Sequence, residues 1–176
     1  MSDAISCETR LTILIRRDGI GQVMEGVGSE MDVHTTRFGT ISVPPQDELL
    51  FPLGLIGLEN CVRWAVLTDS DNPSLGWLQS IEHGHIALGV VSPRRFVPDY
   101  QLRIDRDDLR LLELTTVRDA EVVVIASRLE AELTLNLRAP LVINVEQRRG
   151  CQVVAKDAYS VRYPLTSQLV PLRRTA

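Results

Sequence analysis

The sequence has few cysteines, few aromatic residues and no long apolar run. Its three cysteines, Cys7, Cys61 and Cys151, lack the close spacing of a zinc knuckle and cannot all pair in a disulfide framework. The longest purely aliphatic stretch, residues 122–126, has about five residues, whereas a membrane-spanning helix needs about 20. These features predict a soluble protein in the reducing cytoplasm, with no membrane contact.

The charge balance is mildly acidic. With 19 Lys and Arg against 23 Asp and Glu, the formal net charge is −4 and the pI is about 5.4. Binding to a phosphate backbone is driven by clustered Lys and Arg that release counterions, so this balance disfavours nucleic acid and suits a basic protein partner. A small β-barrel RNA-binding module is kept as the alternative function, although only 5% of residues are aromatic and could stack on bases.

Sites for catalysis or metal binding are not evident in the sequence. His83 and His85 would point to the same side of a strand and could share a metal, but no third ligand is apparent and Gly84 between them indicates a loop. His34 stands alone. Nucleophilic catalysis requires a glycine-flanked serine or a cysteine supported by histidine, and neither motif occurs. We therefore predict a protein that is not an enzyme and that holds no cofactor and no metal.

Apolar and polar residues alternate with a period of two over much of the chain from about residue 40, which is the pattern of half-buried β-strands. The connections are short, as antiparallel sheets permit, and closing the sheet removes exposed edges. The sequence therefore predicts an all-β protein, a small antiparallel β-barrel-like domain with at most one short helix. The predicted strands are residues 40–43, 62–67, 77–81, 86–91, 121–127, 133–138, 141–146 and 151–155.

Two local patterns complete the predicted secondary structure. Residues 147–150 separate two strands and predict a hairpin whose final glycine takes the left-handed conformation. Residues 105–114 predict the short helix, with Asp105 capping its free amides and Leu109 and Leu112 on one face.

The N-terminal part differs from the rest. It crowds four glycines between positions 19 and 28 and shows little sustained periodicity. We expect residues 1–32 to be a flexible extension or a misassigned start, and residues 33–176 to form the barrel domain.

Several short motifs follow one another in a characteristic order. They are TRFG at 36–39, FPLGLIGLE at 51–59, WLQS at 77–80, PDY at 98–100, LNLRAPLVIN at 135–144, RGCQV at 149–153 and YSVRYPL at 159–165. In this order and spacing they resemble the flagellar assembly factor family, FliW, over about residues 35–165. The match departs from the family at Tyr163, where many relatives carry histidine before the proline, and at Cys151, where they carry a bulkier or basic residue.

The resemblance implies a cytoplasmic regulator that works by binding other proteins. Its expected partners are the carbon storage regulator CsrA, a small dimeric RNA-binding translational repressor, and newly made flagellin. While flagellin occupies the factor, the repressor is free and flagellin translation stops; secretion of flagellin reverses this by mass action. Flagellin synthesis would thus be coupled to flagellum assembly.

The segment at residues 51–58 is the first candidate for partner binding. Its proline and two glycines prevent regular secondary structure and predict an ordered loop. The apolar residues Phe51, Leu55 and Leu58 would fill either a partner's pocket or the protein's own core, and a turn that only closes the barrel explains the segment equally well.

The remaining candidates are Tyr100, Asn136 and Asn144. Both asparagines flank a strand break at Pro140, where their amides could bind backbone groups of a loop or of a partner's chain, and the structural role is slightly favoured. Tyr100 follows a turn and would either pack on the core or contact a partner.

Overall fold

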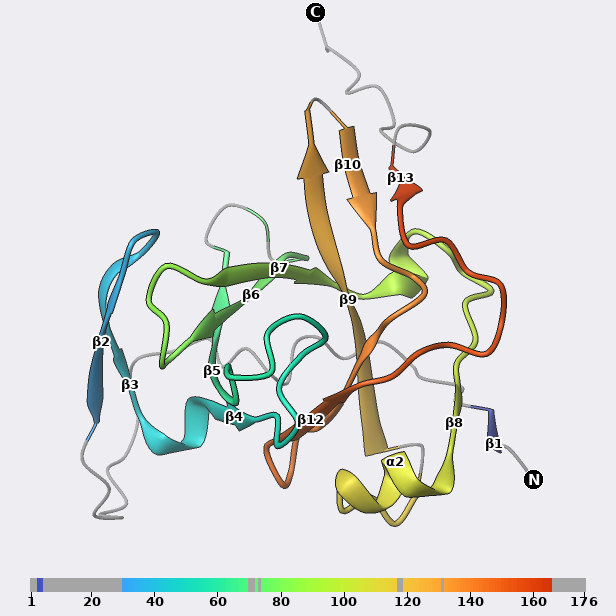
Figure 1. Ribbon diagram of the computed structural model, residues 1–176, viewed down its shortest axis with the longest axis horizontal. Coiled ribbons are helices and arrows are strands. Elements are labelled where there is room, and N and C mark those ends of the chain that lie inside the picture. Colours follow the sequence, from blue (N-terminus) through green and yellow to red (C-terminus); the bar gives the residue numbers. More distant parts are fainter. Residues whose placement is uncertain are drawn as a thin grey trace, which may run out of the picture.

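The computed structural model describes residues 3–4, 30–69, 72, 74–116, 119–130 and 132–165. Seven strands of this part close into a barrel (Figure 1), in the order β4-β5-β6-β7-β9-β11-β12. Neighbouring strands pair antiparallel except β12 and β4, which pair in parallel at Arg149 and Leu50 and thereby close the ring. The barrel strands are β4 (Glu48–Leu50), β5 (Arg63–Thr68), β6 (Gly76–Ser80), β7 (Ala87–Val91), β9 (Ala120–Leu129), β11 (Leu141–Asn144) and β12 (Arg149–Gln152).

The other elements surround the barrel. A hairpin of β2 (Met31–Thr35) and β3 (Gly39–Val43) stands on one side, at the left of Figure 1. The all-β prediction is confirmed, and the helical segments of the described residues are short. The remaining elements are β1 (Asp3–Ala4), β8 (Arg103–Ile104), β10 (Glu132–Leu135), β13 (Tyr163–Pro164), α2 (Arg106–Leu111) and two 3-10 turns, η1 (Pro45–Asp47) and η2 (Pro93–Arg95).

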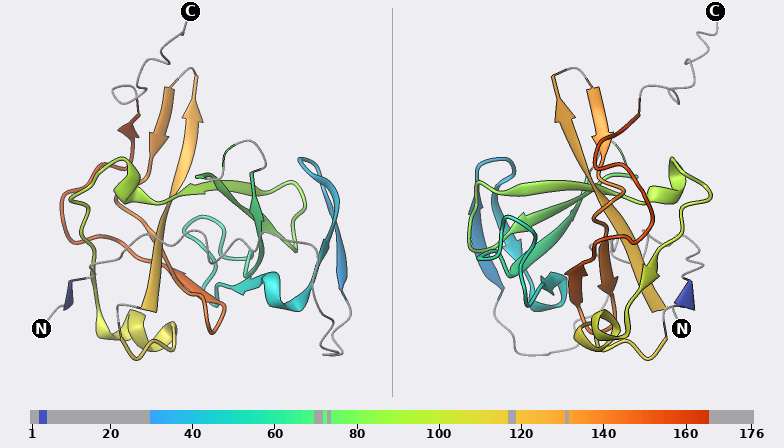
Figure 2. Two further views of the ribbon diagram at one scale, coloured as in Figure 1. Left: turned by 180° about the vertical axis from the view of Figure 1, so that it is seen from behind. Right: turned by 45° about the vertical axis from the view of Figure 1, so that its right-hand side comes forward.

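Strand β9 connects the barrel to a projecting hairpin. One of its edges pairs with β11 over residues 120–123 and then with β10 over residues 126–129, while β7 pairs along the other edge over residues 124–126. The hairpin of β9 and β10 therefore extends beyond the barrel in every view (Figures 1 and 2), and β13 pairs with the outer edge of β10.

The chain between β10 and β11 explains why one edge of β9 serves two strands. The sequence predicted a strand over residues 133–138, but β10 ends at Leu135. Asn136 Oδ1 accepts a hydrogen bond from the Ala139 amide at 3.0 Å, and the Leu137 amide donates to Ser160 instead of to β9. This turn, completed by Pro140, separates β10 from β11 along β9, although the Asn136 amide still donates to the Ile125 carbonyl.

Two other local predictions need correction. Asp105 lies at the N-cap position of α2, but its side chain makes no capping hydrogen bond and instead pairs with Lys156. In the hairpin between β11 and β12, the left-handed residue is Arg148, with φ of 51°, and not Gly150. Gly150 lies within β12, and the Phe51 ring packs on its backbone. Only glycine fits there, because a Cβ atom would stand 2.3 Å from a ring carbon.

The strand prediction succeeded for most barrel strands and missed most of the short ones. Strands β3, β5, β6, β7, β9 and β11 lie where alternation predicted them. Strand β12 begins two residues earlier than predicted, and β1, β2, β4, β8 and β13 were missed. Most of residues 1–32 lie outside the described part, so their flexibility stays a prediction; Met31 already belongs to β2, and Asp3–Ala4 pairs with β8.

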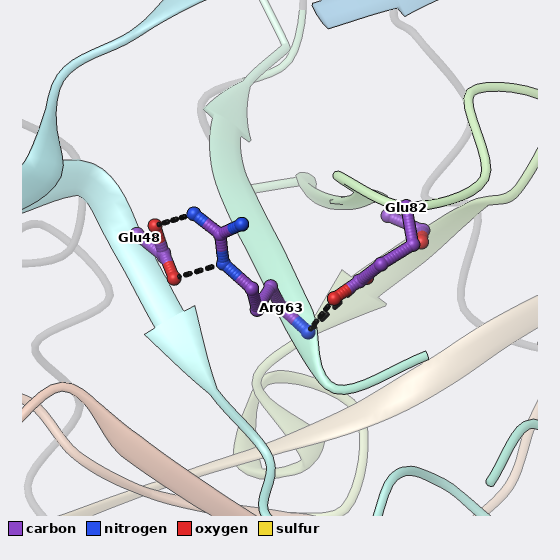
Figure 3. A network of polar contacts seen from close by, with 4 residues as sticks. Glu48, Arg63 and Glu82 are labelled. Carbon is purple, nitrogen blue, oxygen red and sulfur yellow. Dashed lines mark hydrogen bonds and ion pairs between the residues drawn. The ribbon is translucent and has the colours of Figure 1, made fainter. Parts of the chain in front are cut away.

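A polar network joins β4 and β5 to the turn that follows β6. The Arg63 guanidinium donates to both carboxylate oxygens of Glu48, at 2.6 and 2.8 Å, while the Arg63 backbone amide donates to Glu82 (Figure 3). The hydrogen bonds from Arg63 lower the pKa of the Glu48 carboxyl. The network ties β4 and β5 to the turn between β6 and β7.

Asn144 joins the end of β11 to the end of α2. Its side chain is buried, its Nδ2 donates to the Leu112 carbonyl at 2.9 Å, and its Oδ1 accepts from the Gln147 amide at 3.1 Å. The amide therefore satisfies backbone groups that would otherwise be buried without partners.

We expect Asn144→Ala to lower the free energy of unfolding by about 1–3 kcal/mol, because it leaves buried carbonyl and amide groups unpaired. Urea denaturation measures this loss. Arg148→Ala is the control: its side chain is exposed at the adjacent hairpin tip, and we expect a change within about 0.5 kcal/mol. A fully stable Asn144→Ala protein would contradict the structural role.

Candidate partner-binding surface

The loop of residues 51–62 joins β4 to β5 and is anchored in the core. The Phe51 side chain is 0% exposed and Leu55 is 2% exposed; both pack with Trp64 on the floor of the barrel. The Phe51 amide donates to the Val62 carbonyl at 2.7 Å, which pins the two ends of the loop together. The start of the loop is therefore part of the core.

Two left-handed glycines shape the rest of the loop. Gly54 has φ of 64° and Gly57 has φ of 82°. Leu55 and Leu58 exchange backbone hydrogen bonds across the turn, and the Gly57 amide donates to the Glu59 carboxylate at 2.9 Å. This last bond is the main reason that the pKa of Glu59 lies below its usual range.

The loop presents two apolar side chains to solvent. Leu53 is 70% exposed and Ile56 is 65% exposed. The Gln152 side chain of β12 fixes the backbone at Ile56. Its Oε1 accepts a hydrogen bond from the Ile56 amide at 2.8 Å, and its Nε2 donates to the Ala139 carbonyl. Leu53 and Ile56, which we call the apolar ridge, are exposed hydrophobic residues on a backbone that is already fixed, so that binding would cost little ordering entropy.

A groove of about 370 Å³ runs along one side of the apolar ridge, toward the projecting hairpin of β9 and β10. Its lining combines aliphatic residues with two arginines, Arg128 and Arg162. We call it the arginine groove. Its lining residues are Leu55, Ile56, Leu58, Leu88, Ile125, Ser127, Arg128, Thr134, Asn136, Gln152, Val161 and Arg162.

A second groove of about 230 Å³ lies on the other side of the ridge, next to α2. We call it the acidic groove, because Glu59 and Asp108 line it. Leu55, Ile56 and Gln152 line both grooves. An occupant of either groove would therefore contact the same ridge. The acidic groove is lined by Leu53, Gly54, Leu55, Ile56, Glu59, Asp108, Leu111, Cys151 and Gln152.

The structure separates the residues that the sequence singled out. Phe51 and Leu55 fill the core, and Tyr100 is 2% exposed with its hydroxyl donating to the Leu137 carbonyl at 2.9 Å. Burial raises the pKa of Tyr100 well above its usual value, with the neighbouring Tyr159 adding to the effect. For these residues the core alternative holds in the described structure.

The other three candidates differ from one another. Leu58 is partly exposed and lines the arginine groove, as does Asn136, whose amide also closes the turn after β10. Asn144 is buried beneath α2 and faces no groove. Both Leu58 and Asn136 could be reached by a partner in the arginine groove. That they contact a partner stays a prediction.

The most exposed large apolar residues of this surface, Leu53 and Ile56, are not among the candidates predicted from the sequence. Each stands beside a glycine of the loop, and this pattern could have indicated side chains turned outward. Arg128 and Arg162 are far apart in the sequence and line one groove only through the pairing of β9, β10 and β13, so no local signal reveals them.

The groups considered for chemistry lie apart in the described structure. His83 and His85 face each other with ring centroids 6.0 Å apart, but the described residues contain no cluster of three or more side chains that could hold a metal. Burial raises the pKa of the Cys151 thiol to about 12, which leaves it protonated and unreactive at neutral pH. Among the described residues, no helix is long and apolar enough to cross a membrane.

The fold and this surface define a class: small closed β-barrels that present a rigid apolar loop suited to contact with another protein. The family model described as FliW protein matches residues 32–165. The chain belongs to the FliW family of flagellar assembly factors.

Individual relatives agree with this assignment. "Flagellar assembly factor FliW" of Syntrophus aciditrophicus (strain SB) is 38% identical over 139 residues, which cover 77% of this chain and 87% of the relative. The protein of the same name from Caldanaerobacter subterraneus subsp. tengcongensis is 34% identical over 144 residues, 79% of this chain and 95% of the relative. A solved structure, "Crystal structure of the flagellar assembly factor FliW", superposes with a TM-score of 0.71 at 27% identity and covers 76% of this chain and 96% of its own.

The two loop glycines provide a matched test of loop rigidity. A Cβ atom on Gly54 would lie 2.6 Å from the Glu59 Cα atom, whereas one on Gly57 would meet nothing within 4 Å. We expect Gly57→Ala to cost about 1–2 kcal/mol of stability, from left-handed strain alone. Gly54→Ala should cost clearly more, because the backbone at Glu59 must move. Urea midpoints of the two variants provide the comparison, and equal losses would show that the Gly54 contact does not hold the loop.

Proposed function

We propose that this flagellar assembly factor is a cytoplasmic protein-binding regulator that sequesters the translational repressor CsrA and also binds flagellin. The observation that carries the proposal is the apolar ridge, in which Leu53 and Ile56 are exposed on a rigid loop. Exposed apolar side chains with fixed positions between grooves are typical of protein-binding sites. Membership in a family of flagellar assembly factors supports flagellar proteins as the partners.

The shared ridge supports a switch between the two partners. Because Ile56 and Gln152 line both grooves, two proteins that each cover the ridge would exclude one another. Accumulating flagellin then displaces CsrA by mass action, and the freed repressor stops flagellin translation. Export of flagellin reverses the exchange.

Charge supports the acidic groove as the side that faces the repressor. An RNA-binding protein presents basic surface, and Glu59 and Asp108 line the groove beside α2 in a chain of net charge −4. Complementary charge would increase the association rate and selectivity more than the final affinity. The alternative, a small RNA-binding barrel, requires a basic, aromatic surface, and none of the residues lining either groove is aromatic.

Ile56→Lys should lower the affinity for flagellin and for CsrA by about tenfold or more, because a central apolar contact is replaced by a solvated charge. Val154→Lys is the matched control, since Val154 is also an apolar residue, 56% exposed, and lines neither groove. Binding to each purified partner is measured by isothermal titration calorimetry.

Circular dichroism and urea midpoints of both variants establish that the fold is intact. Equal loss of affinity in the two variants would show that the ridge is not the binding site. Binding of structured RNA by the wild-type chain, falling steeply with salt, would favour the RNA-binding alternative instead.

A further inference from the structure

We propose that the arginine groove binds a segment of a partner protein in which an apolar side chain lies next to a carboxylate. The inference rests on the proposed function in one respect, that a partner protein covers the apolar ridge. It adds the chemistry of the segment that the partner inserts beside that ridge. The groove is not a uniform apolar patch, because both aliphatic residues and arginines line it.

Part of the groove lining is aliphatic. Leu58, Leu88 and Ile125 are partly buried and pack on the barrel core that contains Phe51 and Leu55. Ile56 lines the same groove. An apolar side chain placed against these residues would cover groups that are exposed only because no element of the described chain lies over them.

The groove lining also contains polar and positively charged residues. Beyond residue 126, β9 is paired with β10 and no longer with β7. Ser127 and Thr134 are register partners on this extension and line the groove, and the Thr134 hydroxyl donates to the Ser127 carbonyl. Arg128 and Arg162, both exposed, also line the groove.

The two groove arginines have no carboxylate partner among the described residues. The ion pairs of that part of the chain involve Arg63, Arg110, Arg149 and Lys156. Arg128 donates only to the backbone carbonyl of Glu130, at a long 3.3 Å. Two guanidinium groups, each with five N–H donors in a planar fork, are suited to bidentate binding of a carboxylate.

A peptide carboxylate fits this site better than a nucleic-acid phosphate. Single-stranded nucleic acid is held by aromatic side chains on which bases stack, and the groove contains aliphatic residues in their place. The net charge of −4 also opposes a polyanion, whereas it opposes a single carboxylate only weakly. The combination of aliphatic residues and arginines in one groove therefore selects an acidic and apolar segment of a protein.

The test uses the full-length chain and a set of overlapping 12-residue peptides that cover the flagellin of the same organism. Binding of fluorescein-labelled peptides is measured by anisotropy with the wild-type chain and with Arg128→Glu, Arg162→Glu and the double variant. Arg103→Glu is the control, because Arg103 is an exposed arginine outside the groove and gives the same change in net charge.

We expect the bound peptides to carry an apolar residue within about three positions of an Asp, a Glu or the terminal carboxylate. Each groove variant should weaken their binding by about tenfold, the control should leave it unchanged, and replacing the carboxylate by its amide should weaken wild-type binding to a similar extent. A peptide with Lys in place of the acidic residue should regain affinity for Arg162→Glu.

Three results would overturn the proposal. Bound peptides that are neutral or basic would contradict it, as would an equal loss with Arg103→Glu, or binding of a 12-nucleotide RNA that depends on the same arginines. Intact flagellin, measured in parallel, separates this proposal from the proposed function. If Ile56→Lys abolishes its binding and the arginine variants do not, the proposed function stands and the groove chemistry is wrong. If neither flagellin nor any peptide binds the wild-type chain, both fall.

Discussion

The structure depends on how the hydrogen-bonding edge of β9 is divided between two strands. Its first half pairs with β11 inside the barrel and its second half with β10 outside it. The division is possible because Asn136 caps a turn and Pro140 offers no amide to the ladder. If the chain continued straight from β10, the residues after it would pair with β9 in another register than β11 does, and the register that brings β12 to β4 would be lost.

A second contact shapes the candidate partner-binding surface. The ring of Phe51 lies against the bare backbone of Gly150, so the loop after β4 is anchored directly on β12. Gln152, two residues farther along β12, then holds Ile56 from the same strand. The loop stands between α2 and the hairpin of β9 and β10, and a groove runs along each of its sides. The rigidity of the loop thus comes from the barrel and not from the loop sequence alone.

Much of the fold could be predicted because alternation is a local property. Strands such as β5 and β9 are long enough to show a period of two, whereas β4 and β13 have three and two residues and show none. Gly150 was singled out from the sequence as a left-handed turn residue, which is wrong. Glycine is required there because the ring of Phe51, far away in the sequence, leaves no room for a Cβ atom. The candidate surface was harder to predict for the same reason. Phe51 and Leu55 are as apolar as Leu53 and Ile56, and only the packed structure shows which side chains face solvent.

The proposed switch requires flagellin and CsrA to compete for one apolar ridge. Its most direct test is size-exclusion chromatography with light scattering on an equimolar mixture of this chain, flagellin and CsrA, after each pair has been measured alone. Competition predicts two binary complexes whose proportions follow the partner concentrations, with no species that contains all three proteins. A stable ternary complex, with its mass equal to the sum of the three components, would show that the partners occupy separate surfaces and would contradict the account.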